Sequence, residues 1–140
     1  MFDIDIVYEA ALEANFSVGH RNPNMIEVLL TSTETLVFEN LVDQDDTIIY
    51  FKTSSWHSHG DLFCQHYETE VELVPMEILR DLRSGKLLIT KHQFPDDQID
   101  MSLEFGDQIG DVNYYLGAGE AITFMRLAPN AAVKRRLSQR

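Results

Sequence analysis

The sequence predicts a single α+β domain, in which a mostly antiparallel sheet of about five strands packs with two helices. The 140 residues, 44% of them hydrophobic, suffice for one domain with its own core. Two segments combine helical spacing of apolar residues with good helix formers, and several short runs are rich in β-branched and aromatic residues. We expect the domain to cover residues 1–129, followed by a flexible basic tail over residues 130–140.

The first helix is predicted over residues 5–15. This stretch contains the run YEAALEA, which is rich in strong helix formers, and Gly19 beyond it supplies a stop. Residues 2–8 also alternate as a strand would, but the helix formers favour a helix. The apolar stripe of that helix consists of Ile4, Val7, Tyr8, Ala11 and Leu12.

Short strands are predicted in the first half of the chain. Residues 20–24 are expected to form a turn, and residues 25–30 a short buried strand. Residues 34–42 fit no single element type. Residues 47–52 hold four apolar residues in succession, which predicts a central strand covered on both faces.

A single strand is predicted from residue 64 to residue 74, because residue character alternates cleanly there. One face would carry Phe63, Tyr67, Thr69, Val71 and Leu73. The opposite face would carry Cys64, His66, Glu68, Glu70 and Glu72. That second face would present acids to solvent or to a partner.

The second half of the chain has the clearest helix pattern. Pro75 suits the first helical position and Gly85 follows the last apolar residue, which predicts a helix over residues 75–84. The remaining expectations are a strand over 86–90, a loop with a short strand over 94–110, and the last strand over 120–127.

The net charge of −12 is strongly negative for this length. Residues 1–125 hold all 23 acidic residues and six basic ones, whereas residues 126–140 hold five basic residues and no acid. Such a field repels nucleic acid and attracts basic proteins, so we expect a basic protein partner and no nucleic acid. The alternative is that the charge serves solubility alone.

The sequence also excludes several classes of protein. No apolar run approaches the roughly 20 residues that a membrane-spanning helix needs, so no membrane partner is expected. The first residues carry acids where a signal peptide would carry Lys or Arg. The lone Cys64 cannot form an internal disulfide, and we therefore expect a cytoplasmic protein.

A His-rich segment, SSWHSHGDLFCQHYETE, offers candidate metal ligands. His57, His59 and Asp61 occupy alternate positions, and alternate residues of an extended segment point the same way. Imidazole and carboxylate are ligands that zinc uses, so these three residues and Glu70 could hold zinc or another divalent metal. The alternative is structural, with Trp56 packed on the sheet and the histidines bonded to a turn at Gly60 or exposed.

Two metalloenzyme signatures resemble this segment. His57 to Asp61 match the His-x-His-x-Asp-His motif of the metallo-β-lactamase family up to Leu62, which stands where the next His belongs, and we reject this match because that fold needs a longer chain. The segment WHSHG resembles the start of the JAMM metalloprotease signature, with Tyr67 at its Ser position and Glu70 at its Asp position. That resemblance spans about fourteen residues and implies metal ligation by His57, His59 and Glu70. The upstream Glu of that signature could be Glu27, Glu34 or Glu39.

The leading functional hypothesis is an acidic intracellular binding protein that docks a basic partner, as immunity-type inhibitors of toxic enzymes do. Trp56 and Tyr67 are the candidate anchors. The candidate acidic contacts are Glu68, Glu70, Glu72, Asp96, Asp97, Asp100, Asp107 and Asp111. The alternative is a small metal-binding protein or metal-dependent hydrolase using the loop from His57 to Asp61. We assign no catalytic residue, and the leading hypothesis needs no cofactor.

Overall fold

The computed structural model describes residues 1–60, 62–109 and 116–127, and for residues 63–65 it describes the backbone only. The elements, in chain order, are α1 (Ile4–Glu13), β1 (Ser17–Asn22), β2 (Met25–Leu29), β3 (Thr35–Leu41), η1 (Val42–Gln44), β4 (Asp46–Phe51), β5 (His57–His59), β6 (Leu62–His66), β7 (Thr69–Leu73), α2 (Pro75–Ser84), β8 (Leu87–Gln93), β9 (Ile99–Phe105), η2 (Gly106–Gln108) and β10 (Ala121–Met125).

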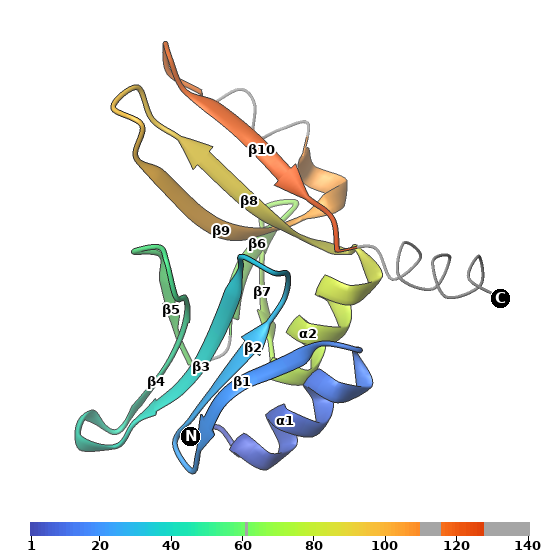
Figure 1. Cartoon of the computed structure of the whole chain (residues 1–140). Coiled ribbons are helices and arrows are strands. Elements are labelled where there is room, and N and C mark those ends of the chain that lie inside the picture. Colours follow the sequence, from blue (N-terminus) through green and yellow to red (C-terminus); the bar gives the residue numbers. More distant parts are fainter. Residues whose placement is uncertain (61, 110–115, 128–140) are drawn as a thin grey trace, which may run out of the picture.

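The strands form three antiparallel sheets. Strands β1 to β5 form a five-stranded sheet in sequence order, β10, β8 and β9 form a three-stranded sheet, and β6 and β7 form a hairpin. The two helices lie side by side, with α1 against β1 and β2 and α2 against β7 and β8, and the hairpin stands between the two larger sheets (Figure 1). The predicted α+β domain with two helices and a five-stranded antiparallel sheet is confirmed, but the two smaller sheets were not predicted.

Helix α1 begins and ends near its predicted bounds. The side chain of Asp3 caps it by accepting hydrogen bonds from the backbone N–H groups of Asp5 and Ile6, at 3.1 and 3.4 Å. The helix ends at Ala14, and Asn15 takes a positive φ of 63°. The expectation that Gly19 stops the helix is therefore wrong, because Asn15 already turns the chain.

Strand β1 occupies most of the segment that was predicted as a turn. Gly19 and His20 lie within β1, and the reversal into β2 is confined to Pro23 and Asn24. Strand β2 matches its prediction, and the ambiguous segment 34–42 contains β3. Pairing with β2 on one side and β4 on the other fixes β3 as a strand, which its residues alone do not specify.

The hydrophobic core fills the space between the helices and the inner faces of the sheets. The residues that line it include Val7 and Ala11 of α1, Ile26, Phe38, Ile49 and Phe51 of the five-stranded sheet, Ile78, Leu79 and Leu82 of α2, and Leu87, Ile89 and Leu103 of the three-stranded sheet. Because all three layers share one cluster, they form a single core.

Strand β4 departs from the prediction of a strand covered on both faces. Thr47, Ile49 and Phe51 are buried, whereas Ile48 and Tyr50 are half-buried on the other side. We call this other side the open face of the five-stranded sheet. By the strand register it carries Glu27, Val37, Glu39, Ile48, Tyr50, His57 and His59.

Residues 64–74 form a hairpin, and the prediction of one continuous strand is wrong. Tyr67 and Glu68 make a two-residue turn in which both have positive φ, 48° and 67°. The turn reverses the chain, so His66 pairs with Thr69 and shares its face. Its ring lies 4.7 Å from that of Phe105, which places His66 away from Glu70 and Glu72.

Helix α2 has its predicted bounds, with the side chain of Glu77 accepting from the N–H of Val74 at 3.3 Å and Gly85 at a φ of 82°. Strands β8 and β10 were also expected. The loop with a short strand that was predicted over 94–110 contains β9, which at seven residues is longer than the short strand expected. Its alternate residues Met101, Leu103 and Phe105 are buried, and this burial outweighs the acids between them.

An ion pair between a buried carboxylate and a partly exposed lysine joins the two larger sheets. Glu34, which precedes β3, is only 4% exposed, and its carboxylate lies 2.6 Å from the Nζ atom of Lys91 on β8. The hydroxyl of Thr33 donates a second hydrogen bond to the same carboxylate oxygen, at 3.2 Å. Neither helix in the described residues has the length and hydrophobicity to cross a bilayer.

Candidate functional site

Most of the predicted partner-binding residues fall into two groups, at opposite ends of β9. Tyr67, Glu68, Glu70 and Asp107 surround the tip of the β6–β7 hairpin, whereas Asp96, Asp97 and Asp100 lie at the turn between β8 and β9. Glu72 pairs with Phe63 near the other end of the hairpin and stands apart from both groups. Seven residues of strand span about 20 Å, so one small contact cannot cover both groups. Asp111 and Asp61 lie outside the described residues.

Trp56 belongs to the second group and is half-buried. Its ring packs against Phe51, with the ring centroids 5.7 Å apart. The preceding residue, Ser55, donates a hydrogen bond from its hydroxyl to Asp100, at 3.3 Å. The Oγ atom of Ser54 also accepts from the backbone N–H of Met101, at 3.1 Å. Trp56 thus attaches the β4–β5 connection to the core, and Ser54 and Ser55 attach it to β9.

Tyr67 is the more exposed of the two predicted anchors, with 60% of the residue accessible. The structure nevertheless holds it in place. Its backbone N–H donates to the side chain of Gln108 at 3.1 Å, and its hydroxyl lies 3.5 Å from the backbone carbonyl of Asp107. His66 adds a ring contact at 4.4 Å. The tip therefore presents a large aromatic side chain in an ordered position.

Asp107 ties the hairpin tip to the end of β9. Both of its carboxylate oxygens lie within 3.1 Å of the Nε2 atom of His66. This hydrogen bond is the main reason why the pKa of Asp107 is lowered from its ordinary value. Asp107, Glu68 and Glu70 are exposed, and none of the three forms an ion pair with Lys or Arg within the described ranges. Tyr67, Glu68, Glu70 and Asp107 together are called the hairpin surface below.

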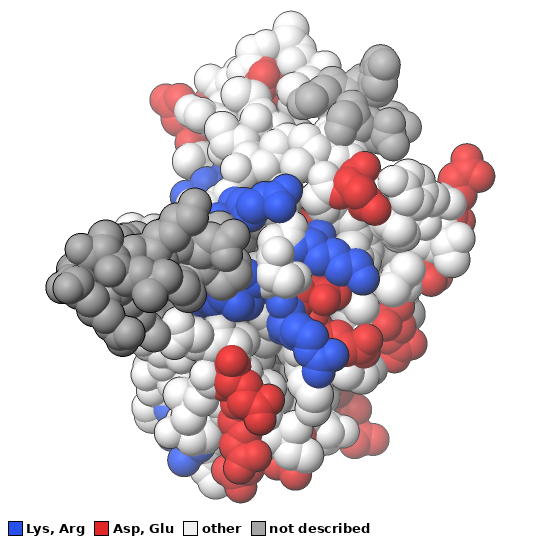
Figure 2. Space-filling model, turned by 90° about the vertical axis from the view of Figure 1, so that its right-hand side faces the viewer, with Lys and Arg blue, Asp and Glu red and all other residues white. Residues whose placement is uncertain are grey.

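The Lys and Arg side chains lie mainly on another face of the molecule. Figure 2 shows them gathered in the middle of the face that carries α2, with acidic side chains around them. The residues that make up this patch are Arg80, Arg83, Lys86 and Arg126. Arg126 lies against Gly85 at the C-terminal end of α2, where a positive charge is favourable.

The other three Lys and Arg residues of the described chain already have partners. Lys52 forms an ion pair with Glu27 at 2.8 Å, and Lys91 forms the ion pair with Glu34. Arg21 stacks over the ring of Tyr8, with its guanidinium carbon 3.8 Å from the ring centroid. Away from the α2 face, the surface charge is therefore dominated by acids.

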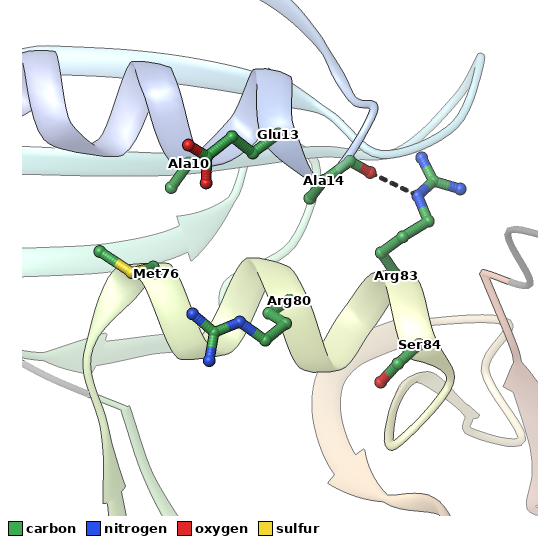
Figure 3. Close-up of a pocket in the computed structure, with 7 residues that line it drawn as sticks. All are labelled: Ala10, Glu13, Ala14, Met76, Arg80, Arg83 and Ser84. Carbon is green, nitrogen blue, oxygen red and sulfur yellow. Dashed lines mark hydrogen bonds between the residues drawn. The ribbon is translucent and has the colours of Figure 1, made fainter.

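A pocket of about 340 Å³ lies between the two helices (Figure 3). Ala10, Ala14 and Met76 supply its apolar part, and Glu13 of α1 and Arg80 of α2 extend into it with opposite charges. This pocket was not predicted, because only the packing of α1 on α2 creates it. Its mixed lining does not identify a ligand.

Arg83, at one end of this pocket, has a structural role. Its Nε–H donates to the carbonyl of Ala14 at 2.7 Å, and its Nη2 donates to the carbonyl of Asn15 at 3.0 Å. Its guanidinium also stacks on Phe16, 4.1 Å from the ring centroid. These carbonyls end helix α1, so Arg83 caps one helix from the other.

The predicted metal ligands are only partly brought together. His57 and His59 lie on the short edge strand β5 and share the open face, with ring centroids 5.1 Å apart at an interplanar angle of 82°. They lie on a strand, whereas a loop was expected. Glu70 lies on β7, in a different sheet. No group of three His, Cys, Asp or Glu side chains gathers into a metal site among the residues that the structure describes.

Sequence reasoning missed the polar neighbours of the histidine pair. Asp46, the first residue of β4, lies 2.7 Å from the Nδ1 atom of His59. Elsewhere on the open face, the hydroxyl of Tyr50 donates to Glu39 at 2.8 Å. Burial, and then this hydrogen bond, raise the pKa of Tyr50 to about 12. The strand register would have revealed these neighbours, because it places Tyr50 opposite His57.

The three glutamates that precede the His-rich segment are all engaged elsewhere. Glu27 pairs with Lys52, Glu34 pairs with Lys91, and Glu39 accepts from Tyr50. Hydrogen bonds from Lys52 and from the backbone of His20 lower the pKa of Glu27. No protein-family model, curated protein or solved structure matches the chain, so its function has to be inferred from these residues.

Proposed function

We propose that the protein is an acidic binding protein that docks a basic protein partner in the cytoplasm, with the hairpin surface at the centre of the contact. The observation that most directly supports this is the exposed side chain of Tyr67, held in place among the carboxylates of Glu68, Glu70 and Asp107. An immunity-type inhibitor of a toxic basic enzyme is the function class that fits this chemistry.

The charge distribution supports a partner that approaches from the acidic side. Outside the α2 patch, each Lys or Arg of the described residues is already paired or stacked, so the acids there face solvent with little compensation. Complementary charge speeds association and directs the partner to one face. Asp96 and Asp97, exposed at the β8–β9 turn, add to this attraction from outside the central contact. The same field disfavours nucleic acid.

Tyr67 would supply binding energy from buried apolar area, which charge alone does not provide. Tyrosine is frequent among the residues that carry most of the binding energy of interfaces, because it buries a large area with few rotatable bonds. Two hydrogen bonds to η2 reduce the entropy that Tyr67 would lose on binding. A basic partner could therefore stack a Lys or Arg stem on this ring and pair its charge with the glutamates.

The test is partner capture on immobilised, purified full-length chain at about 0.15 M salt, where weak non-specific attraction is largely screened. The wild type is compared with Tyr67→Ala and with the double charge reversal Glu68→Lys, Glu70→Lys. We expect a basic protein to be retained by the wild type and lost from both variants. Inhibition of that protein's own activity by the soluble chain would establish the immunity-type function.

A matched control is Glu9→Lys, Glu13→Lys on helix α1. Both side chains are exposed, and this variant has the same net charge as the hairpin variant. It should retain the partner, because the proposed contact is elsewhere. Equal loss from both double variants would show that net charge alone attracts the protein, and that the hairpin surface is not a binding site.

A further inference from the structure

We propose that His57 and His59 bind a Zn²⁺ ion through their Nε2 atoms on the open face of the five-stranded sheet, and that Asp46 and the backbone carbonyl of Ser55 orient the two rings. This site lies on a different sheet from the hairpin surface and is independent of partner binding. It differs from the ligand set predicted from the sequence, since it uses neither Asp61 nor Glu70.

The strand geometry gives both rings access to one point in solvent. His57 and His59 are alternate residues of β5, opposite Tyr50 and Ile48 of β4, so their side chains leave the same face of the sheet. Both histidines are exposed. Strand β5 is also the edge of its sheet, which leaves one side of the pair free of a further strand.

The hydrogen bonds assign the tautomer of both rings. The Nδ1 atom of His59 lies 2.7 Å from a carboxylate oxygen of Asp46, and that of His57 lies 3.3 Å from the carbonyl oxygen of Ser55. Both neighbours are acceptors, so each Nδ1 carries the hydrogen and donates it. In the neutral imidazoles, each Nε2 then presents its lone pair. That is the form in which histidine binds a metal.

Asp46 is itself held in place for this role. Its Oδ1 atom accepts from the backbone N–H of Thr47 at 2.8 Å, while its Oδ2 atom faces His59. A carboxylate or carbonyl behind the ring is the usual second partner of a metal-binding histidine, because it fixes the orientation of the ring and makes the free nitrogen more basic. Both histidines of the pair have such a partner.

The separation of the rings fits tetrahedral zinc. With Zn–N distances of about 2.0–2.1 Å, and roughly 1.2 Å from nitrogen to ring centre, two imidazoles at a tetrahedral angle have centroids about 5.2 Å apart. The observed separation is 5.1 Å. An octahedral ion with neighbouring imidazoles would bring the centroids to about 4.5 Å at the same bond length. The separation of the rings therefore leaves room for a tetrahedral ion between them, with water at the two remaining positions.

The first experiment is calorimetric titration of untagged, chelator-treated full-length chain with ZnCl₂. We expect one Zn²⁺ per chain, and at least a tenfold loss of affinity in His57→Ala and in His59→Ala. His20→Ala is the matched control, because His20 is exposed on β1 of the same sheet and its ring has no hydrogen bond to another described residue. Wild-type affinity in either β5 variant, or no binding by the wild type, would overturn the proposal.

A second measurement identifies the ligand atoms. In ¹⁵N spectra of the imidazole rings, Zn²⁺ should shift the Nε2 signals of His57 and His59 while their Nδ1 atoms stay protonated. Binding through Nδ1 would contradict the proposed site. Asp46→Asn should weaken binding by about tenfold or more, as is usual when a partner behind a ligand is lost, whereas unchanged affinity would refute its orienting role. Unchanged Zn²⁺ binding by the Glu68→Lys, Glu70→Lys variant would keep this site distinct from the proposed function.

Discussion

Replacing Arg83 with alanine should destabilise the fold more than alanine at any other position that lines the α1–α2 pocket. The side chain makes two charged hydrogen bonds to the last carbonyls of α1 and stacks on Phe16. Its removal leaves the carbonyls of Ala14 and Asn15 without this cap. Burial also lowers the pKa of the Arg83 guanidinium, which nonetheless stays charged at neutral pH.

The expected magnitude follows from these three contacts. Hydrogen bonds from a charged donor contribute about 1.5–3 kcal/mol each, and the lower end applies because the bond to Asn15 is exposed. The contact with Phe16 adds about 0.5–1 kcal/mol. Allowing for water that replaces part of the cap, the loss in Arg83→Ala is about 2–3 kcal/mol. At roughly 3 °C per kcal/mol for a chain of this length, Tm should fall by about 6–9 °C.

The assay is thermal unfolding followed by circular dichroism, with urea titration as a check on two-state behaviour. Arg80→Ala is the matched control, because Arg80 lies on the same helix and lines the same pocket without a hydrogen bond in the described structure. Arg83→Lys should lose about half as much stability as Arg83→Ala, since lysine keeps the charge but not the planar set of donors. A Tm of Arg83→Ala equal to that of Arg80→Ala would refute the capping role.

Three further predictions concern single side chains. Asn40→Ala should cost about 2 kcal/mol, seen as a lower urea midpoint with an unchanged slope, because the buried amide accepts from the N–H of Phe2 and donates to its carbonyl. Burial raises the pKa of Glu104, so the charged form of this side chain opposes folding. At a pH above that pKa, Glu104→Gln should therefore have a Tm a few degrees higher than that of the wild type. The same gain in Tm at low pH, where the wild-type carboxyl is protonated, would count against this cause. In an alkaline absorbance titration of the folded protein, Tyr50→Phe should remove a phenol that ionises near pH 12, and the reasoning fails if every tyrosine of the wild type ionises near pH 10.

The sequence predicted best those elements whose ends are set by local chemistry. Helix α2 was placed correctly because Pro75 and Gly85 have fixed backbone preferences that do not depend on the rest of the fold. The β6–β7 turn was missed for the opposite reason. Neither Tyr67 nor Glu68 signals a positive φ, and the turn is supported by contacts with residues about 40 positions away, among them Gln108.

The sequence indicated which residue types could form a site, but not which residues would contact one another in the folded chain. Alternation along the chain correctly placed His57 and His59 on one face, because that depends on strand geometry alone. The contact between Asp46 and His59 could not be predicted from the sequence, since only the pairing of β4 with β5 brings the two residues together. The acidic residues were likewise seen as one set, whereas β9, whose acids obscured its apolar alternation, separates Asp100 from Asp107.

The ion pair between Glu34 and Lys91 has a consequence for how this chain can evolve. Loss of Lys91 would leave the buried carboxylate of Glu34 uncompensated, at a cost of about 3–5 kcal/mol, so a change at position 91 alone would be selected against. Loss of Glu34 would cost less, because the side chain of Lys91 is partly exposed to solvent. Loss of both in one lineage, in favour of apolar residues, would be tolerated. Positions 34 and 91 of diverged sequences should therefore covary. The pair of residues found at these positions would indicate whether the two larger sheets of a diverged protein still pack in the same way.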